Sequence, residues 1–179
     1  MNINIIAAMS KNRVIGINGK LPWNIPKDLK YFKEKTSGKN TALIMGSNTW
    51  KSLPTYPEPL PNRISWVATK NNIYNTRAMI IKDLENFDIS RMQKIYDDIW
   101  ICGGQSIYEH FIDKPYIDKI YLTEIDYEIK KGDTFFPELP SHFTKVIHGP
   151  TYKYQLNALK FIDYNFCVYK NTSLFNYKS

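Results

Sequence analysis

The chain has 179 residues, with 24 lysines and arginines against 17 aspartates and glutamates, which gives a formal net charge of +7. A chain of this length fits one domain that buries roughly two-thirds of its unfolded surface, and its charge favours anionic partners. The basic residues are scattered singly rather than in runs, so small molecules with phosphate or carboxylate groups fit at least as well as nucleic acid. A general abundance of lysine explains much of the excess equally well.

Short apolar runs alternate with helical patterns along the chain. Strands are expected at residues 3–9, 41–46, 64–68, 78–81, 99–102, 117–126, 143–149 and 160–169. Helices are expected at residues 26–36, 47–53, 83–96 and 105–112. Over the first ~115 residues this alternation predicts an α/β fold, a mainly parallel sheet with helices on both faces, to which the last two strands add antiparallel edges.

Three segments are predicted to be irregular. Residues 10–20 carry the asparagines and glycines of a loop, residues 54–61 contain four prolines that keep the chain extended, and residues 134–140 form an apolar loop. We find no repeat, low-complexity tract or long linker. Residues 1–179 are therefore expected to form a single domain, with residues 170–179 as a tail without an assigned role.

The segment at residues 21–36 places one carboxylate, Asp28, on the apolar side of a helix. The helix is expected to begin near Pro26, because proline suits the first helical turn. At ~3.6 residues per turn, the side chains on the same face as Asp28 are Leu29, Phe32 and Thr36. Such an acid can simply complement the helix dipole. Alternatively, because an apolar loop with Trp23 leads into it, Asp28 binds a cationic or amidine-like edge of a ligand.

Two strand-to-helix turns are candidate anion sites. Gly46 ends one buried strand just before a helix that Ser47 to Thr49 can cap. Gly103 and Gly104 end another strand, where a ligand phosphate or ring can approach the backbone. A tight turn alone also explains the double glycine, and the dinucleotide fingerprint GxGxxG is absent.

Cysteine and histidine spacing indicates no local metal motif. Cys102 and Cys167 lie in separate apolar runs, and the three histidines are widely spaced in sequence. We therefore expect no metal site, and two buried thiols in a reducing compartment. No apolar run approaches ~18 residues and no basic region precedes the apolar start, so a cytoplasmic protein is expected.

Taken together, the motifs resemble those of dihydrofolate reductase from end to end. The matching segments, in the order of the family, are IIAAM, RVIG with LPWNIPKDLKYFK, IMGSNTW, PLPNR, IWICGGQSIY, IYLTEID and DTFFP. The resemblance implies a sheet of eight strands, mostly parallel with an antiparallel C-terminal end. It also implies NADPH-dependent reduction of 7,8-dihydrofolate to tetrahydrofolate.

The resemblance assigns the substrate site residue by residue. Asp28 would bind the pterin and promote its protonation, with Thr123 bonded to the carboxylate and a water near Trp23 delivering the proton. The alternative for Thr123 is an ordinary strand threonine. Arg63 would pair with the α-carboxylate of the glutamate tail, a role suited to a planar, always-charged group. The apolar walls implied by the resemblance are Ile6, Leu29, Phe32 and Leu53.

The cofactor implied by the resemblance is NADPH, beneath a mobile lid at residues 14–23. Lys70 would meet the 2′-phosphate, and Tyr108 would lie against the nicotinamide. Many relatives carry a basic residue where this chain has Ser47, so one phosphate-facing charge is missing. The full set of implied cofactor contacts is Ala8, Ile15, Gly16, Asn48, Thr49, Thr69, Lys70, Gly103, Gly104, Gln105, Ser106, Ile107 and Tyr108.

Two other functions compete with this one. A reductase of the same fold could act on a different pyrimidine- or pterin-like ring, although the matches at Asp28, Arg63 and Thr123 favour folate. A basic nucleic-acid-binding protein would instead show clustered lysines with exposed aromatic residues. We expect a monomer that needs neither nucleic acid nor a membrane.

Overall fold

A computed structural model describes residues 2–72 and 76–173 of the chain. Its strands are β1 (Asn2–Ser10), β2 (Val14–Gly16), β3 (Thr41–Gly46), β4 (Ile64–Ala68), β5 (Met79–Ile81), β6 (Asp98–Ile101), β7 (Ile117–Ile125), β8 (Thr134–Phe135), β9 (Phe143–Asn157) and β10 (Lys160–Asn171). Its helices are α1 (Pro26–Thr36), α2 (Ser47–Ser52), α3 (Ile89–Gln93) and α4 (Gln105–Phe111).

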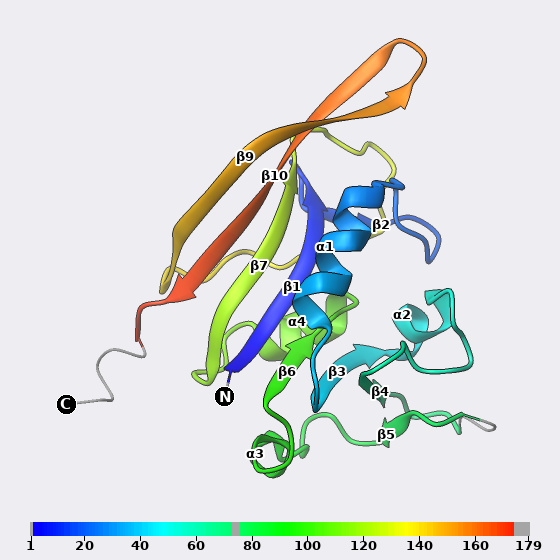
Figure 1. Cartoon of the computed structure of the whole chain (residues 1–179), viewed down its shortest axis with the longest axis vertical. Coiled ribbons are helices and arrows are strands. Elements are labelled where there is room, and N and C mark those ends of the chain that lie inside the picture. The colour runs from blue at the N-terminus through cyan, green and yellow to red at the C-terminus, as the bar shows by residue number, and fades with distance from the viewer. Residues whose placement is uncertain (1, 73–75, 174–179) are drawn as a thin grey trace.

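The main sheet has eight strands in the order β5-β4-β3-β6-β1-β7-β10-β9 (Figure 1). The pairs from β5 to β7 are parallel, whereas β10 pairs antiparallel with both β7 and β9. The predicted α/β fold, with a mostly parallel sheet and an antiparallel C-terminal end, is therefore confirmed.

Helices cover both faces of this sheet, as expected. Strand β3 is buried on both sides because its residues alternate between two apolar clusters. Ala42 and Ile44 join the cluster that contains residues of α3 and α4. Leu43 and Met45 join the cluster that contains Trp50 of α2, against which Phe32 of α1 packs. A ligand between the sheet and α1 would therefore contact the second cluster.

Two predicted loops each contain a short strand, so the irregular assignments of residues 10–20 and 134–140 were wrong there. Strands β2 and β8 pair antiparallel, with Val14 opposite Phe135. The backbone N–H of Phe136 also donates to the carbonyl of Arg13 at 2.8 Å. These strands have three and two residues, too few for an alternating pattern to appear in the sequence.

The helix predicted at residues 83–96 was also wrong, because α3 spans only Ile89–Gln93. The carboxylate of Asp83 accepts hydrogen bonds from the N–H groups of Glu85 and Asn86 and holds a turn. The carboxylate of Asp88 then caps α3 by accepting from the N–H of Ser90 at 3.0 Å. Local side-chain bonds therefore compete with the helix over its predicted first turns.

The last two strands are longer than predicted and form a twisted ribbon that extends from the body (Figure 1). Gly149 and Pro150 do not end β9, because it is an edge strand and proline is tolerated at an edge. Lys170 and Asn171 belong to β10, so the tail assignment at 170–179 began too early; residues 174–179 lie outside the described part.

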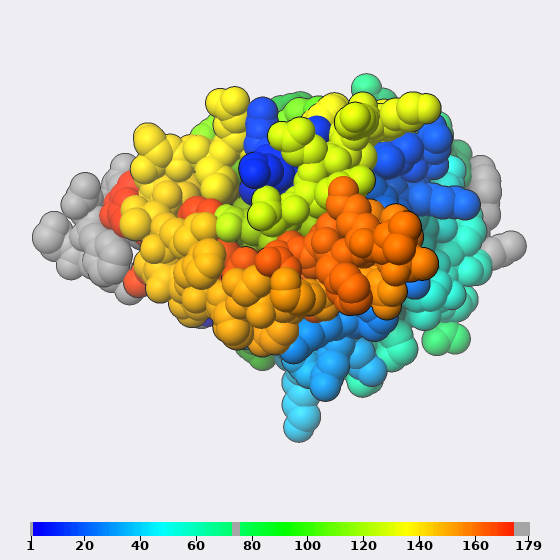
Figure 2. Space-filling model, turned by 90° about the horizontal axis from the view of Figure 1, so that it is seen from above, coloured from blue at the N-terminus to red at the C-terminus, as the bar shows by residue number. Residues whose placement is uncertain are grey.

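The tip of this ribbon meets the segment that precedes β8. Figure 2 shows the orange tip beside yellow-green residues, and Lys160 lies over the ring of Tyr127 at 4.2 Å. Both segments line a cavity of about 370 Å³.

In the described part of the chain, no helix is long and apolar enough to cross a membrane.

Candidate active site

Asp28 and Thr123 form the polar centre of the candidate site. Asp28 lies in the first turn of α1 and Thr123 on β7, 95 positions apart in sequence. The hydroxyl of Thr123 donates to Oδ1 of Asp28 at 2.6 Å. Burial raises the pKa of the Asp28 carboxyl, and this hydrogen bond lowers it in part. The result is a partly desolvated carboxylate held in one orientation.

Three of the four predicted apolar walls lie in one cluster beside α1. Ile6 of β1 is buried in it, and Phe32 and Leu53 pack against it. Leu29 lies outside this cluster and is 50% exposed, so the predicted apolar face of α1 is open at that position. An exposed leucine next to Asp28 offers apolar surface that a flat ring can cover.

Trp23 is buried in a different cluster, with Ile25 and Ile125. Its indole Nε1 is buried and has no hydrogen-bond partner among residues 2–72 and 76–173. A buried indole N–H usually finds a partner, so this atom fits a site for an ordered water. The predicted lid at residues 14–23 is held near its middle, where the N–H of Asn18 donates to Asp133 at 2.7 Å.

Arg63 is buried, with 7% of its surface exposed, at the C-terminal end of α1. Its Nη1 donates to the hydroxyl of Thr36 at 2.9 Å, and its Nε donates to the carbonyl of Pro61 at 3.1 Å. Burial lowers the pKa of the guanidinium, which nevertheless stays charged. No carboxylate of the described residues forms an ion pair with it. A buried and unpaired cation suits an anionic ligand.

The two glycine turns meet at the carboxyl ends of neighbouring strands β3 and β6. The N–H of Gly46 donates to the carbonyl of Gly103 at 2.7 Å. Gly103 has a φ of +96°, and a Cβ there would lie 2.7 Å from the ring of Tyr108. Tyr108 is buried and donates to the carbonyl of Ile6 at 2.8 Å, which connects the turn to one of the predicted apolar walls.

Several of the remaining predicted cofactor contacts lie beside these glycine turns. A Cβ on Gly104 would lie 3.6 Å from the hydroxyl of Thr49, and Ile107 packs beside Gly46. Ser106 and Asn48 are exposed. The side chain of Gln105 is used within the protein, because its Oε1 accepts from the N–H of Phe135 and its Nε2 donates to Glu109. Ala8, Ile15 and Gly16 lie on β1 and β2.

A pair of lysines marks the end of β4. Lys70 is exposed just after this strand, next to Thr69. Lys82 follows the parallel neighbour β5, and its Nζ donates to the carbonyl of Asn71 at 2.7 Å and to that of Lys70 at 3.4 Å. Sequence reasoning missed Lys82, although the parallel pairing of the two strands brings their ends together.

Comparisons with known proteins agree with this geometry. The family model described as dihydrofolate reductase matches residues 2–171. A dihydrofolate reductase of Buchnera aphidicola subsp. Acyrthosiphon pisum is 44% identical over 138 residues, covering 77% of this chain and 80% of that protein. One of Aedes albopictus is 32% identical and covers 93% of this chain and 96% of its own length. One of Staphylococcus aureus is 36% identical and covers 76% of this chain and 79% of its own length.

The residues matched by the family model include the sheet, the glycine turns and the Asp28–Thr123 pair. The sequence motifs, the strand order and the relatives therefore agree with one another. The chain belongs to the dihydrofolate reductase family, whose members are oxidoreductases of one-carbon metabolism.

Proposed function

We propose that this chain reduces 7,8-dihydrofolate to 5,6,7,8-tetrahydrofolate with NADPH. The observation that carries the proposal is the partly buried carboxylate of Asp28, bonded to Thr123 at 2.6 Å beside an apolar cluster. A pterin presents a ring N–H and an exocyclic amino group side by side. An ionised carboxylate binds such an edge with two parallel charge-assisted hydrogen bonds.

The same carboxylate promotes protonation of the pterin. Hydride transfer to the imine carbon leaves negative charge on the adjacent nitrogen unless a proton arrives there. Asp28 raises the basicity of the bound ring by its own charge, and a water near Nε1 of Trp23 supplies the proton. The unpartnered Nε1 supports this role, because it can donate to the oxygen of such a water.

Arg63 binds the other end of the substrate. The glutamate tail of dihydrofolate carries an α-carboxylate, and the buried guanidinium is already oriented by Thr36 and Pro61. A planar guanidinium can bind that carboxylate with two parallel hydrogen bonds. Between the two ends, Ile6, Phe32 and Leu53 provide an apolar surface for the pterin and the aminobenzoyl group.

The glycine turns and the lysine pair suit NADPH, which supplies the hydride when it is bound. Gly104 leaves room for a phosphate or ring to approach the backbone, whereas the space beside Gly46 and Gly103 is occupied by Ile107 and Tyr108 of the chain itself. Lys70 and Lys82 carry positive charge at the end of β4, where they can favour the extra phosphate of NADPH over NADH. Ser47 contributes no charge there, so the preference rests on the two lysines.

The decisive experiment follows the loss of NADPH absorbance after dihydrofolate is added. The native chain is compared with Asp28→Asn and with Glu34→Gln, a control that removes an exposed acid of the same helix. We expect rapid oxidation by the native chain and the control, and at least about a hundredfold slower turnover by Asp28→Asn. A folded native chain that does not oxidise NADPH would refute the proposal.

Two alternatives have distinct outcomes in this assay. A reductase for a different ring would oxidise NADPH with another pterin or pyrimidine but not with dihydrofolate. A nucleic-acid-binding protein would bind RNA in a salt-dependent manner without oxidising NADPH.

We further propose that the chain is cytoplasmic and acts as a monomer. Sedimentation at micromolar concentration would test the monomeric state.

A further inference from the structure

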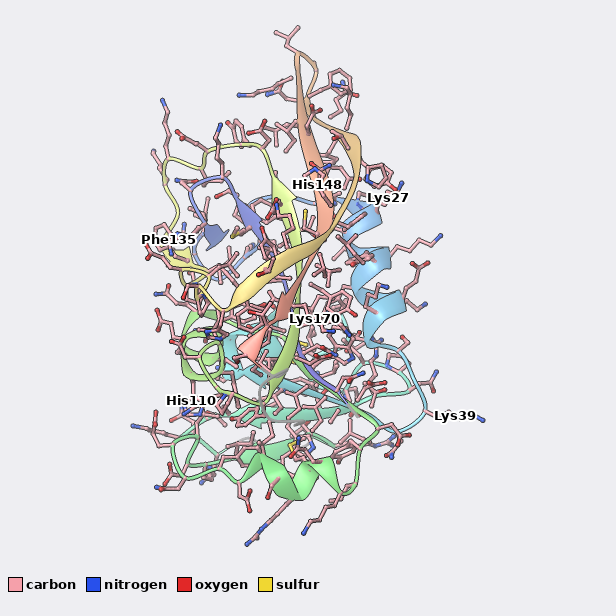
Figure 3. All side chains as sticks on the ribbon, turned by 90° about the vertical axis from the view of Figure 1, so that its left-hand side faces the viewer. Lys27, Lys39, His110, Phe135, His148 and Lys170 are labelled. Atoms are coloured by element: carbon pink, nitrogen blue, oxygen red, sulfur yellow. The ribbon has the colours of Figure 1, made fainter. Side chains whose placement is uncertain are left out.

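The antiparallel end of the sheet holds three potential metal ligands that the proposed reaction does not use. Glu124 lies on β7, His148 on β9 and Cys167 on β10, and their ligand atoms all lie within 4.8 Å of one another. Figure 3 shows His148 on the ribbon formed by the last two strands. Sequence spacing gave no sign of this cluster, because its members are brought together only by strand pairing.

Strand register explains why these side chains converge. Cys167 pairs with Leu122 of β7 on one side and with His148 of β9 on the other. Residues directly opposite each other in an antiparallel pair project to the same face. Glu124 lies two positions beyond Leu122 and therefore shares that face. Three neighbouring strands thus each contribute one ligand to the same patch.

The two distances from Cys167 suit a tetrahedral ion. Sγ of Cys167 lies 3.4 Å from Oε2 of Glu124 and 3.7 Å from Nδ1 of His148. Zinc bonds of ~2.0–2.3 Å at tetrahedral angles separate the ligand atoms by roughly 3.3–3.7 Å. Thiolate, imidazole and carboxylate are also the ligand types that zinc prefers. We propose that Glu124, His148 and Cys167 bind one divalent cation of the zinc type.

A cation at this site must displace the ammonium group of Lys145 and the thiol proton of Cys167. Lys145 donates to Oε2 of Glu124 at 2.8 Å, and its side chain is one-third exposed, so it can move into solvent. The hydroxyl of Tyr169 donates to Oε1 and can keep orienting the carboxylate. The thiol proton of Cys167 leaves when the metal binds. Both displacements lower the affinity relative to a closed structural zinc site.

This site is separate from the substrate site. Thr123 and Glu124 are consecutive on β7, so their side chains project to opposite faces of the sheet. Thr123 meets Asp28, whereas Glu124 meets Cys167 on the other face. A bound cation would therefore join β7, β9 and β10 without contacting the pterin. We expect it to raise the Tm of the chain rather than to enter the reaction.

Cobalt(II) is the probe for this site, because a thiolate ligand produces a charge-transfer band in the near-ultraviolet. The full chain, reduced and freed of metal, is titrated with cobalt and then with zinc. We expect a band that saturates at one equivalent and disappears when zinc replaces cobalt. Cys167→Ser should abolish the band, while Cys102→Ser, which removes the other buried thiol, should retain it.

A second pair of variants keeps the test valid if Cys167→Ser fails to fold. His148 is exposed, so His148→Gln should fold normally, and it should weaken zinc binding by at least about tenfold. His142→Gln, a control on a histidine outside the cluster, should bind zinc like the native chain. The proposal is overturned if the native chain gives no band, if the band persists in Cys167→Ser, or if His148→Gln binds zinc as tightly as the native chain.

Discussion

The hydroxyl of Thr36 accepts a hydrogen bond from Nη1 of Arg63 at 2.9 Å and donates its own proton to the carbonyl of Phe32 at 2.8 Å. This threonine thus connects the last turn of α1 to the cation proposed to bind the substrate tail. Thr36→Val keeps the shape but removes the acceptor, so the guanidinium loses its orientation. We expect KM for dihydrofolate to rise by about tenfold, with the Kd for NADPH unchanged.

Thr36→Ser serves as the control for this prediction, because it keeps the hydroxyl and should keep KM near the native value. The measurement is steady-state kinetics with dihydrofolate, together with NADPH binding followed by fluorescence. Equal KM values for the valine and serine variants would show that Thr36 does not position Arg63.

The burial of Asp28 should reduce the stability of the folded chain at neutral pH. Because burial raises the pKa of Asp28 in the folded state, the folded chain binds more protons than the unfolded chain between the two pKa values. The free energy of unfolding therefore falls as pH rises through this window and stays lower above it. Asp28→Asn should raise Tm by a few degrees at pH 7 and change it little at a pH below both pKa values. A lower Tm at pH 7 would contradict this account.

Thr123 should set the pH dependence of the reaction through Asp28. Its hydrogen bond lowers the pKa of the carboxyl, so Thr123→Val should raise that pKa further. The measurement is kcat/KM against pH, in which the limb due to Asp28 should move to higher pH. Thr123→Ser keeps the donor and should restore the native profile. If the profile of the valine variant does not move, Thr123 does not influence the ionisation of Asp28.

The alternation of apolar runs and helices was enough to predict the sheet, because strands such as β3 are continuous apolar segments covered on both faces. It was not enough where local hydrogen bonds or pairing with distant strands determine where an element begins and ends. Asp83 and Asp88 shorten the helix predicted around them, and β9 continues past Pro150 only because it is an edge strand. Contacts between distant residues, such as those that surround Cys167, depend on strand register and are invisible to local spacing.

The close contact between Gly103 and Tyr108 predicts an unusual cost for a single methyl group. Gly103→Ala would place Cβ 2.7 Å from the buried ring and at a φ of +96°, so the variant should lose about 2–3 kcal/mol of unfolding free energy. Gly104→Ala is the matched control, because its Cβ would make an ordinary contact of 3.6 Å with Thr49. Urea unfolding measures both variants. Similar stability of the two variants would show that the ring of Tyr108 does not constrain this turn.

The lysine pair at the end of β4 predicts how the chain distinguishes its two nicotinamide cofactors. Because Ser47 carries no charge, Lys70 should provide much of the attraction for the 2′-phosphate of NADPH, and Lys82 should add to it from the neighbouring strand end. Lys70→Gln should weaken NADPH binding by about tenfold at low salt and leave NADH binding unchanged, since NADH lacks that phosphate. Lys94→Gln, a control on an exposed lysine after α3, should change neither value. Titration of each variant with both cofactors gives the ratio of the Kd for NADH to the Kd for NADPH. If Lys70→Gln weakens the binding of both cofactors equally, Lys70 attracts either cofactor and does not distinguish between them.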